Sequence, residues 1–310
     1  MSGSYWTSTQ RLEWQCSRSE LQSRRQRLWR WEIGRWPQGL QLQSAGDSTE
    51  TAESAGDTST DASASASSAP HSTPRTLPIH HRDLHYDKDY NLRIYCFLLV
   101  MKLGRRLNIR QTALATAHVY LSRFMLAASV REANLYLLVT TCVYLACKVE
   151  ECPQYIRALV SEARSLWPEF VPPDPTKVTE FEFYLVEELG GWLEVHHAYD
   201  QIDALQRASG IPLAPDDIQQ CWALLNDSYI TDAHLVYPPH ITAAACMFVT
   251  LQVRRPQAQA RYAQFLASAQ IDLEEVQQVV QDMVTLYDHW DRYHEQWVKY
   301  LLRVLYLQRV

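Results

Sequence analysis

The stretch TTCVYLACKVEECPQY, residues 140–155, joins an apolar helical run to one lysine and two glutamates. The apolar residues of the helix expected over 132–151 recur at helical spacing and form one stripe: Leu135, Leu138, Val139, Cys142, Ala146 and Val149. A second stripe follows the far side: Leu137, Tyr144, Lys148 and Glu151. A helix that is apolar on most sides lies at the centre of its bundle. We therefore expect the second stripe to meet another helix or a partner protein.

Lys148 has two explanations. It could complement the negative C-terminal end of its helix dipole, an effect of some tenths of a kcal/mol. Alternatively, the later segment TKVTEFEFYLVEEL, residues 176–189, offers Glu182 as an opposite charge within an apolar run. An exposed lysine–glutamate pair stabilises a protein by only about 0–1 kcal/mol. We therefore interpret the pair as a set of fixed donors and acceptors for the backbone of a partner.

The sequence after residue 80 is helical nearly throughout and shows no alternating strand pattern. Helices are predicted over 89–107, 110–127, 132–151, 154–167 and 175–189, then over 197–208, 215–234, 239–253, 256–267 and 273–293, with a last one over 297–307. Setting Cys142 against Cys246 aligns CVYLACKVEE with CMFVTLQVRR, so the apolar pattern repeats while the charged end does not. This predicts an all-α fold of two tandem five-helix bundles with an additional N-terminal helix.

Five regions are predicted along the chain: an N-terminal helix over 1–37, a disordered low-complexity linker over 38–80, bundles over 81–192 and 193–295, and a C-terminal helix over 296–310. In the first region Trp14, Leu21 and Leu28 recur every seven residues, which predicts a narrow stripe lying across another surface. The nearby arginines could form a nuclear import signal or a patch for an acidic partner, but a solvated helix face is favoured. They are Arg24, Arg25, Arg27 and Arg30.

Composition excludes several classes of protein. The 310-residue chain has no apolar run of 18 residues and no secretory signal, so we expect an intracellular protein with no membrane partner. Its net charge of −6 argues against general binding to nucleic acid, which depends on lysines and arginines that displace counterions from phosphates. The seven cysteines are expected to be reduced thiols, mostly in apolar helices.

Signals of catalysis are missing from the sequence. Cys142, Cys147 and Cys152 recur every five residues, a rotation of about 140° on a helix, so they are expected to point in different directions and to form no metal site. No glycine-rich phosphate loop, GxSxG or HExxH motif occurs. We therefore expect neither a metal nor another cofactor.

Several segments resemble the cyclin family. Residues 89–189 resemble the cyclin box, with Lys148 and Glu182 in place of its signature lysine and glutamate, and residues 196–293 resemble a second box. More narrowly, the chain is similar to the C-type cyclins of the Mediator kinase module, in a fungal-like form with the linker as an insertion. The stretches that carry this likeness are SGSYWTSTQRLEW, LNIRQTALATAHVYLSRF, TCVYLACKVEE, EFEFYLVEEL and LLNDSYITDAHLVYPP.

The resemblance implies a nuclear regulatory subunit with no chemistry of its own. Its partners would be a cyclin-dependent kinase catalytic subunit and other subunits of the Mediator kinase module, and it would activate or repress transcription by RNA polymerase II. The third and fifth helices of the first box would pack against the kinase αC helix. The implied kinase-binding residues are Lys148, Glu182, Tyr144, Glu151, Phe183 and Tyr184, and Trp6 and Glu150 would contact the kinase or a further subunit.

Two other functions share this fold. One is a cyclin of a transcription-elongation kinase, against which the N-terminal YWTSTQRLEW argues. The other is a DNA-contacting relative of the general transcription factors, which the acidic balance disfavours.

Overall fold

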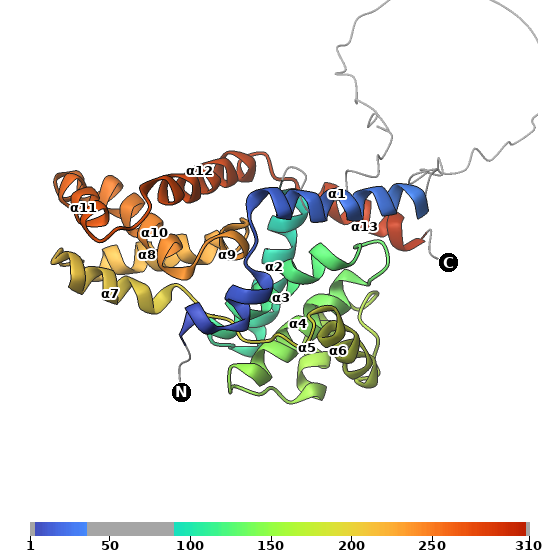
Figure 1. The fold of residues 1–310 in the computed structure, drawn as a ribbon. Helices are drawn as coiled ribbons and strands as arrows, with labels where there is room; N and C mark the ends of the chain where they lie inside the picture. The colour runs from blue at the N-terminus through green and yellow to red at the C-terminus, as the bar shows by residue number, and fades with distance from the viewer. Residues whose placement is uncertain (1–3, 36–89, 308–310) are drawn as a thin grey trace, which may run out of the picture.

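The computed structural model describes residues 4–35 and 90–307, which form helices and connecting loops without any strand. Two bundles lie next to each other (Figure 1). The first contains α2 (Asn91–Leu107), α3 (Gln111–Ala127), α4 (Leu135–Val149), α5 (Ile156–Leu166) and α6 (Thr176–Glu188). The second contains α7 (Tyr199–Ser209), α8 (Pro215–Ser228), α9 (Ala233–Val236), α10 (Pro239–Arg254), α11 (Pro256–Ser268) and α12 (Leu273–Trp290). The predicted all-α class is confirmed, and the predicted linker lies outside the described residues.

Each bundle is built around one central helix. Helix α4 packs against α2, α3, α5 and α6, and α10 packs against α7, α8, α9, α11 and α12. The predicted stripe of α4 is the core face, because Leu135, Leu138 and Cys142 are fully buried. Each such leucine stabilises the fold by about 1.5–3 kcal/mol. The helix begins at Leu135, later than predicted, because the Asn134 side chain accepts hydrogen bonds from the amides of the first turn.

Helix α3 belongs to both cores. Leu114 and Leu121 pack in the first core, whereas Ala115 and Val119 on its other face pack in the second. The side-chain amide of Gln111, at the start of α3, adds a 3.0 Å hydrogen bond to Asn226 of α8. No feature of the repeat pattern identified this shared helix.

The second bundle departs from the prediction at one place. A single helix was expected over 215–234, but α8 ends at Ser228 and α9 begins at Ala233. The Ser228 and Thr231 hydroxyls donate to backbone carbonyls of the preceding turn, which competes with helix continuation. The break brings Asp232 to the junction between the bundles.

The N-terminal segment is not the single helix that the recurrence of apolar residues every seven positions predicted. A short turn (η1, Tyr5–Thr7) and a π-helical turn (η2, Gln10–Trp14) precede α1 (Arg18–Arg35). Between η2 and α1, the Cys16 amide donates to the Leu235 carbonyl at 3.0 Å, which draws the chain out of helical geometry. Ser17 and Glu20 then start α1 by exchanging side-chain and backbone hydrogen bonds, as a capping box does.

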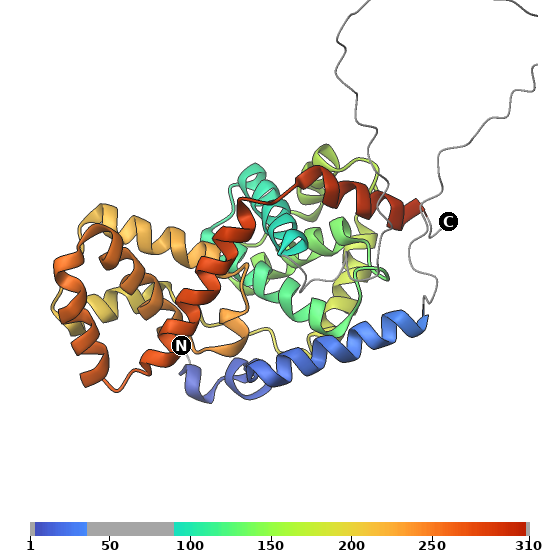
Figure 2. The same cartoon turned by 90° about the horizontal axis from the view of Figure 1, so that it is seen from above.

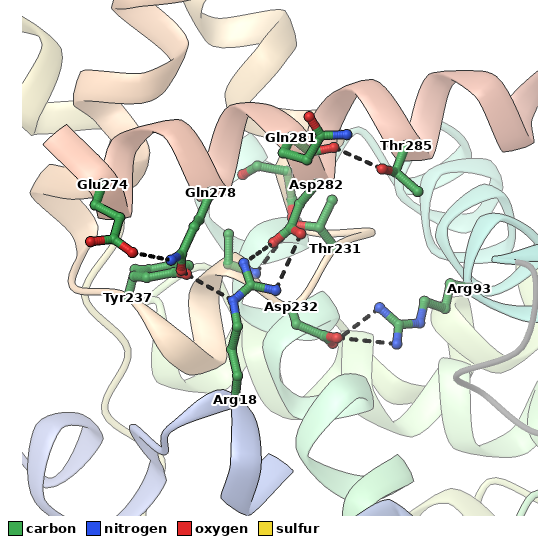
Figure 3. Close-up of polar contacts among 12 residues, drawn as sticks. Arg18, Arg93, Thr231, Asp232, Tyr237, Glu274, Gln278, Gln281, Asp282 and Thr285 are labelled. Atoms are coloured by element: carbon green, nitrogen blue, oxygen red, sulfur yellow. Dashed lines mark hydrogen bonds and ion pairs between the residues drawn. The ribbon is translucent and has the colours of Figure 1, made fainter. Parts of the chain in front are cut away.

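An ionic cluster joins α1 to both bundles. Both oxygens of Asp232 accept from Arg25 of α1, at 2.6 and 2.7 Å, and from Arg93 of α2, at 3.0 and 3.2 Å. Nearby, Arg18 binds Asp282 of α12 at 2.7 Å (Figure 3). The expectation of a fully solvated arginine face is therefore wrong for Arg25, whose partner lies 207 residues away in sequence.

The last helix, α13 (Glu295–Leu307), returns to the first bundle. It packs against α2 and buries Val298, Leu301 and Leu302 in the first core. Figure 2 separates it from α1, with which it overlaps in Figure 1. None of the described helices is long and apolar enough to cross a membrane.

Stability is expected to fall as the pH drops from 7 to 5. Burial lowers the pKa of His118 and of His234 to about 3, with a smaller contribution to His118 from neighbouring His234. An unfolded histidine titrates near pH 6.5. Below about that pH the unfolded chain therefore binds protons that the folded chain does not, which favours unfolding. Urea titrations across this range measure the slope, and His118→Phe, which keeps the stacking on Phe97, should make it shallower.

Candidate functional site

The edge between α4 and α6 carries an ion pair. The Lys148 Nζ lies 2.5 Å from the Glu182 Oε1, so the predicted pairing is present. The two side chains are 45% and 12% exposed, which leaves the ammonium group accessible while the carboxylate is held against the protein. The ammonium also lies 5.1 Å from the centre of the Tyr144 ring, within range of a cation–π interaction. These three side chains therefore form one fixed polar group at the surface.

Helix α6 turns its aromatic side chains in two directions. Tyr184 and Phe181 pack against Phe124 of α3, with ring centres 5.7 and 6.2 Å away. Phe183, between them in sequence, points outward and is 75% exposed. Tyr155, just before α5, is another exposed aromatic that the sequence analysis missed, although it ends the stretch 140–155. An exposed Phe183 beside a fixed ion pair is typical of a protein-binding surface.

Glu151 lies where the chain leaves α4. It is exposed and has a φ of +53°, a left-handed conformation that ends the helical path. The Cys152 amide then donates to the Cys147 carbonyl at 2.9 Å. The Cys147 and Cys152 thiols also hydrogen-bond to each other, so these two side chains do not point apart as predicted. That prediction assumed a helix continuing through residue 152. Burial, with a smaller effect from the adjacent Cys152 thiol, raises the pKa of Cys147 to about 12.

Glu150 faces the second bundle. Its Oε1 accepts a 2.6 Å hydrogen bond from the Thr116 hydroxyl of α3, and the His197 Nε2 lies 3.9 Å away. His197 in turn contacts Thr116 at 2.8 Å and the Tyr229 hydroxyl at 2.6 Å. The hydrogen bond with the His197 imidazole lowers the pKa of Glu150, and the Thr116 hydroxyl lowers it further. Together they outweigh burial, which raises it, so the carboxylate stays ionised.

Trp6 lies in η1 and is exposed, with its ring tilted against His240 at 5.8 Å. It lines the same cavity as Glu150. The structure therefore places the candidate residues in two groups. One surrounds the ion pair between α4 and α6, and the other consists of Trp6 and Glu150.

Comparison with known proteins agrees with this architecture. The family model "Cyclin, N-terminal domain" matches residues 68–194. The "RNA polymerase II holoenzyme cyclin-like subunit" of Saccharomyces cerevisiae is 54% identical over 336 residues, covering 99% of this chain and 98% of that protein. The chain belongs to the family of RNA polymerase II holoenzyme cyclin-like subunits. The Candida glabrata member is 55% identical, over 99% of each chain.

Solved structures support the cyclin fold. A chain of the CAK complex of Chaetomium thermophilum bound to ATP-γ-S has a TM-score of 0.62 at 16% identity, covering 93% of this chain and 79% of that one. A chain of the yeast TFIIK (Kin28/Ccl1/Tfb3) complex has a TM-score of 0.59 at 18% identity, covering 91% and 99%. These structures show the fold alone, and the high identity to the two holoenzyme cyclin-like subunits confirms the resemblance to the C-type cyclins of the Mediator kinase module.

Proposed function

We propose that this chain is the regulatory cyclin of a Mediator-associated cyclin-dependent kinase and has no catalytic chemistry of its own. It acts in the nucleus and regulates transcription by RNA polymerase II through that kinase. The names of its relatives support the connection to the polymerase holoenzyme. The exposed Lys148–Glu182 pair is the observation that carries the proposal.

The kinase contact is assigned to the edge between α4 and α6. There Lys148 and Glu182 hydrogen-bond kinase backbone, and Tyr144, Glu151, Phe183 and Tyr184 complete the surface. A kinase αC helix seated on this edge is held inward, where its glutamate can pair with the lysine that positions ATP. Because the cyclin binds this arrangement better than the inactive one, binding shifts the kinase population toward activity.

The energetics of the ion pair favour recognition over stability. A pair as accessible as Lys148–Glu182 stabilises a fold by about 0–1 kcal/mol. Paired charges that are fixed before binding need less ordering when a partner arrives, which favours association. Trp6 and Glu150, in the other group, are assigned to the kinase or to a further subunit of the Mediator kinase module.

The double variant Lys148→Ala with Glu182→Ala is expected to stay folded and to bind the kinase catalytic subunit about tenfold more weakly, a loss of about 1.4 kcal/mol. Kinase activity at limiting cyclin should fall in proportion. The affinity is measured by surface plasmon resonance with purified catalytic subunit, and folding by thermal denaturation.

A matched control removes another surface ion pair, between Asp288 near the end of α12 and Arg292 just after that helix, whose atoms lie 2.9 Å apart. Its double alanine variant should bind and activate the kinase normally. Full kinase affinity and activity in the Lys148/Glu182 variant would remove the basis of the proposal.

A further inference from the structure

The turn that ends α4 brings two cysteines together. The Cys152 amide donates to the Cys147 carbonyl, and Glu151 before it is left-handed. This is the pattern of a Schellman motif, in which the residue after the left-handed one packs against the residue that accepts its amide hydrogen bond. Here both positions are cysteine, and the two thiols hydrogen-bond to each other. The equivalent positions in the second bundle are Leu251 and Pro256, so only the first bundle has the pair.

The two thiols differ in their access to solvent. Cys147 is fully buried in the first core, and burial keeps its thiol protonated near pH 7 by raising its pKa. Cys152 packs against the edge of that core and is only partly buried, whereas the other six cysteines of the chain are buried. The thiolate is the form of cysteine that reacts with oxidants. An oxidant therefore reacts first with Cys152, whose hydrogen-bonded neighbour is a second sulfur.

We propose that Cys147 and Cys152 form a reversible disulfide and that this bond weakens docking of the kinase. The oxidant is a peroxide. The Cys152 sulfur attacks one peroxide oxygen, so that an S–O bond forms, the O–O bond breaks and one water leaves after proton transfer. The Cys147 sulfur then attacks the sulfenic sulfur of Cys152, an S–S bond forms and a second water leaves. The two thiols lose two electrons and two protons, which convert hydrogen peroxide into two molecules of water.

Forming the disulfide moves the residues that follow α4. A disulfide holds its two sulfur atoms about 2.0 Å apart, closer than two hydrogen-bonded thiols lie. Cys147 is fixed within the core, whereas residues 152–155 form a loop outside any helix. Cys152 therefore moves inward and displaces Glu151, which is assigned to the kinase contact. The effect on docking rests on the proposed function, whereas the disulfide itself does not.

The disulfide is tested on the full chain without the kinase. Purified, reduced protein is treated with hydrogen peroxide, its remaining thiols are blocked with N-ethylmaleimide, and it is digested with trypsin. Lys148 lies between the two cysteines, so trypsin separates them into peptides 132–148 and 149–157. We expect mass spectrometry to find these peptides joined through Cys147 and Cys152, and dithiothreitol to release them. Oxidation of Cys152 to sulfinic or sulfonic acid without joined peptides would refute the disulfide.

Cys142 provides the control, because it is buried and lies in the same tryptic peptide as Cys147. Cys142→Ala should leave the joined peptides unchanged, whereas Cys147→Ala should remove them. Fragmentation of the joined peptides from the unchanged protein gives the same assignment without depending on the folding of either variant. A bond from Cys152 to Cys142 would overturn the proposed pair.

The effect on docking is measured after the peroxide has been removed, so that the kinase is never oxidised. In surface plasmon resonance the oxidised chain should bind the catalytic subunit about fivefold more weakly, at the lower end of coupling between two sites. Dithiothreitol should restore the affinity. Cys152→Ser cannot form the bond and should bind equally well before and after peroxide treatment. Equal affinities of the oxidised and reduced natural chain would refute the effect on docking.

The same coupling acts in the opposite direction. A disulfide that weakens kinase binding is itself disfavoured, by the same factor, when the kinase is bound. In glutathione buffers, the ratio [GSH]²/[GSSG] at half oxidation should therefore be about fivefold lower in the complex than in the free chain. An equal ratio in both would contradict the coupling. A free chain that forms no disulfide would remove this inference and leave the test of Lys148 and Glu182 intact.

Discussion

Replacing Asp232 with alanine is expected to lower the free energy of unfolding by about 3–5 kcal/mol. The carboxylate is the shared partner of Arg25 and Arg93, whose side chains are only 11% and 3% exposed. Its removal leaves two guanidinium groups with little water to replace the lost bonds. Burial alone would raise the pKa of Asp232, but the charges of Arg93 and Arg25 outweigh it and hold the pKa well below its usual range.

Urea denaturation of Asp232→Ala, at neutral pH, measures this loss. If the alanine variant does not fold, Asp232→Asn keeps the shape of the side chain and tests the loss of charge. The control is Asp282→Ala. This carboxylate also pairs with an arginine of α1, but that arginine, Arg18, is 46% exposed. Its cost should be about 0–1 kcal/mol. Equal costs for Asp232→Ala and Asp282→Ala would contradict a special role for the cluster.

The same cluster predicts acid sensitivity. A carboxylate whose pKa is lower in the folded state contributes stability above its unfolded pKa, about 3.9, and loses it as the pH falls toward the folded value. Stability from Asp232 should therefore be complete at pH 6 and should decline below about pH 4. The contribution of His118 and His234 extends from about pH 6.5 down to their folded pKa of about 3, so it overlaps this window. The difference between Asp232→Asn and the unchanged protein isolates the part that is due to Asp232.

The ion pair between α4 and α6 was predictable because its signal is local. A lysine and a glutamate in otherwise apolar helices need partners, and Lys148 and Glu182 lie only 34 residues apart in one bundle. Asp232 gave no such signal. Its partners Arg25 and Arg93 lie 207 and 139 residues away, and aspartate next to threonine in a helical pattern has many ordinary explanations.

The N-terminal segment shows the same limit. The recurrence of its apolar residues every seven positions suggested one helix, but two hydrogen bonds break that helix. The Gln15 side chain donates to the Val236 carbonyl, and the Cys16 amide donates to the Leu235 carbonyl. Periodicity reports what a segment prefers by itself, whereas these bonds depend on α9, which lies about 220 residues further along the chain. Glu150 was likewise identified as a partner contact, but its hydrogen bond from Thr116 of α3 and its approach to His197 required the three-dimensional arrangement.

Phe183→Ala is expected to weaken kinase binding by about 2–4 kcal/mol, roughly 30- to 1000-fold, with little change in stability. A large aromatic ring that is 75% exposed contributes little to its own fold, and α6 is already fixed by Tyr184 and Phe181 against Phe124. In the complex, the partner would cover the Phe183 ring next to the fixed Lys148–Glu182 pair. The ring would then be removed from water at the centre of the contact. Its effect should therefore exceed that of the ion pair.

Val253→Ala is the matched control for Phe183→Ala. Val253 is 72% exposed and lies near the end of α10, the helix that repeats the plan of α4 in the second bundle. Because that helix end lacks the lysine and glutamates of α4, losing its exposed apolar side chain should leave kinase affinity unchanged. Surface plasmon resonance with the catalytic subunit compares the two variants. If both lose affinity equally, the contact depends on exposed apolar area in general, and the edge between α4 and α6 is not the kinase-docking surface.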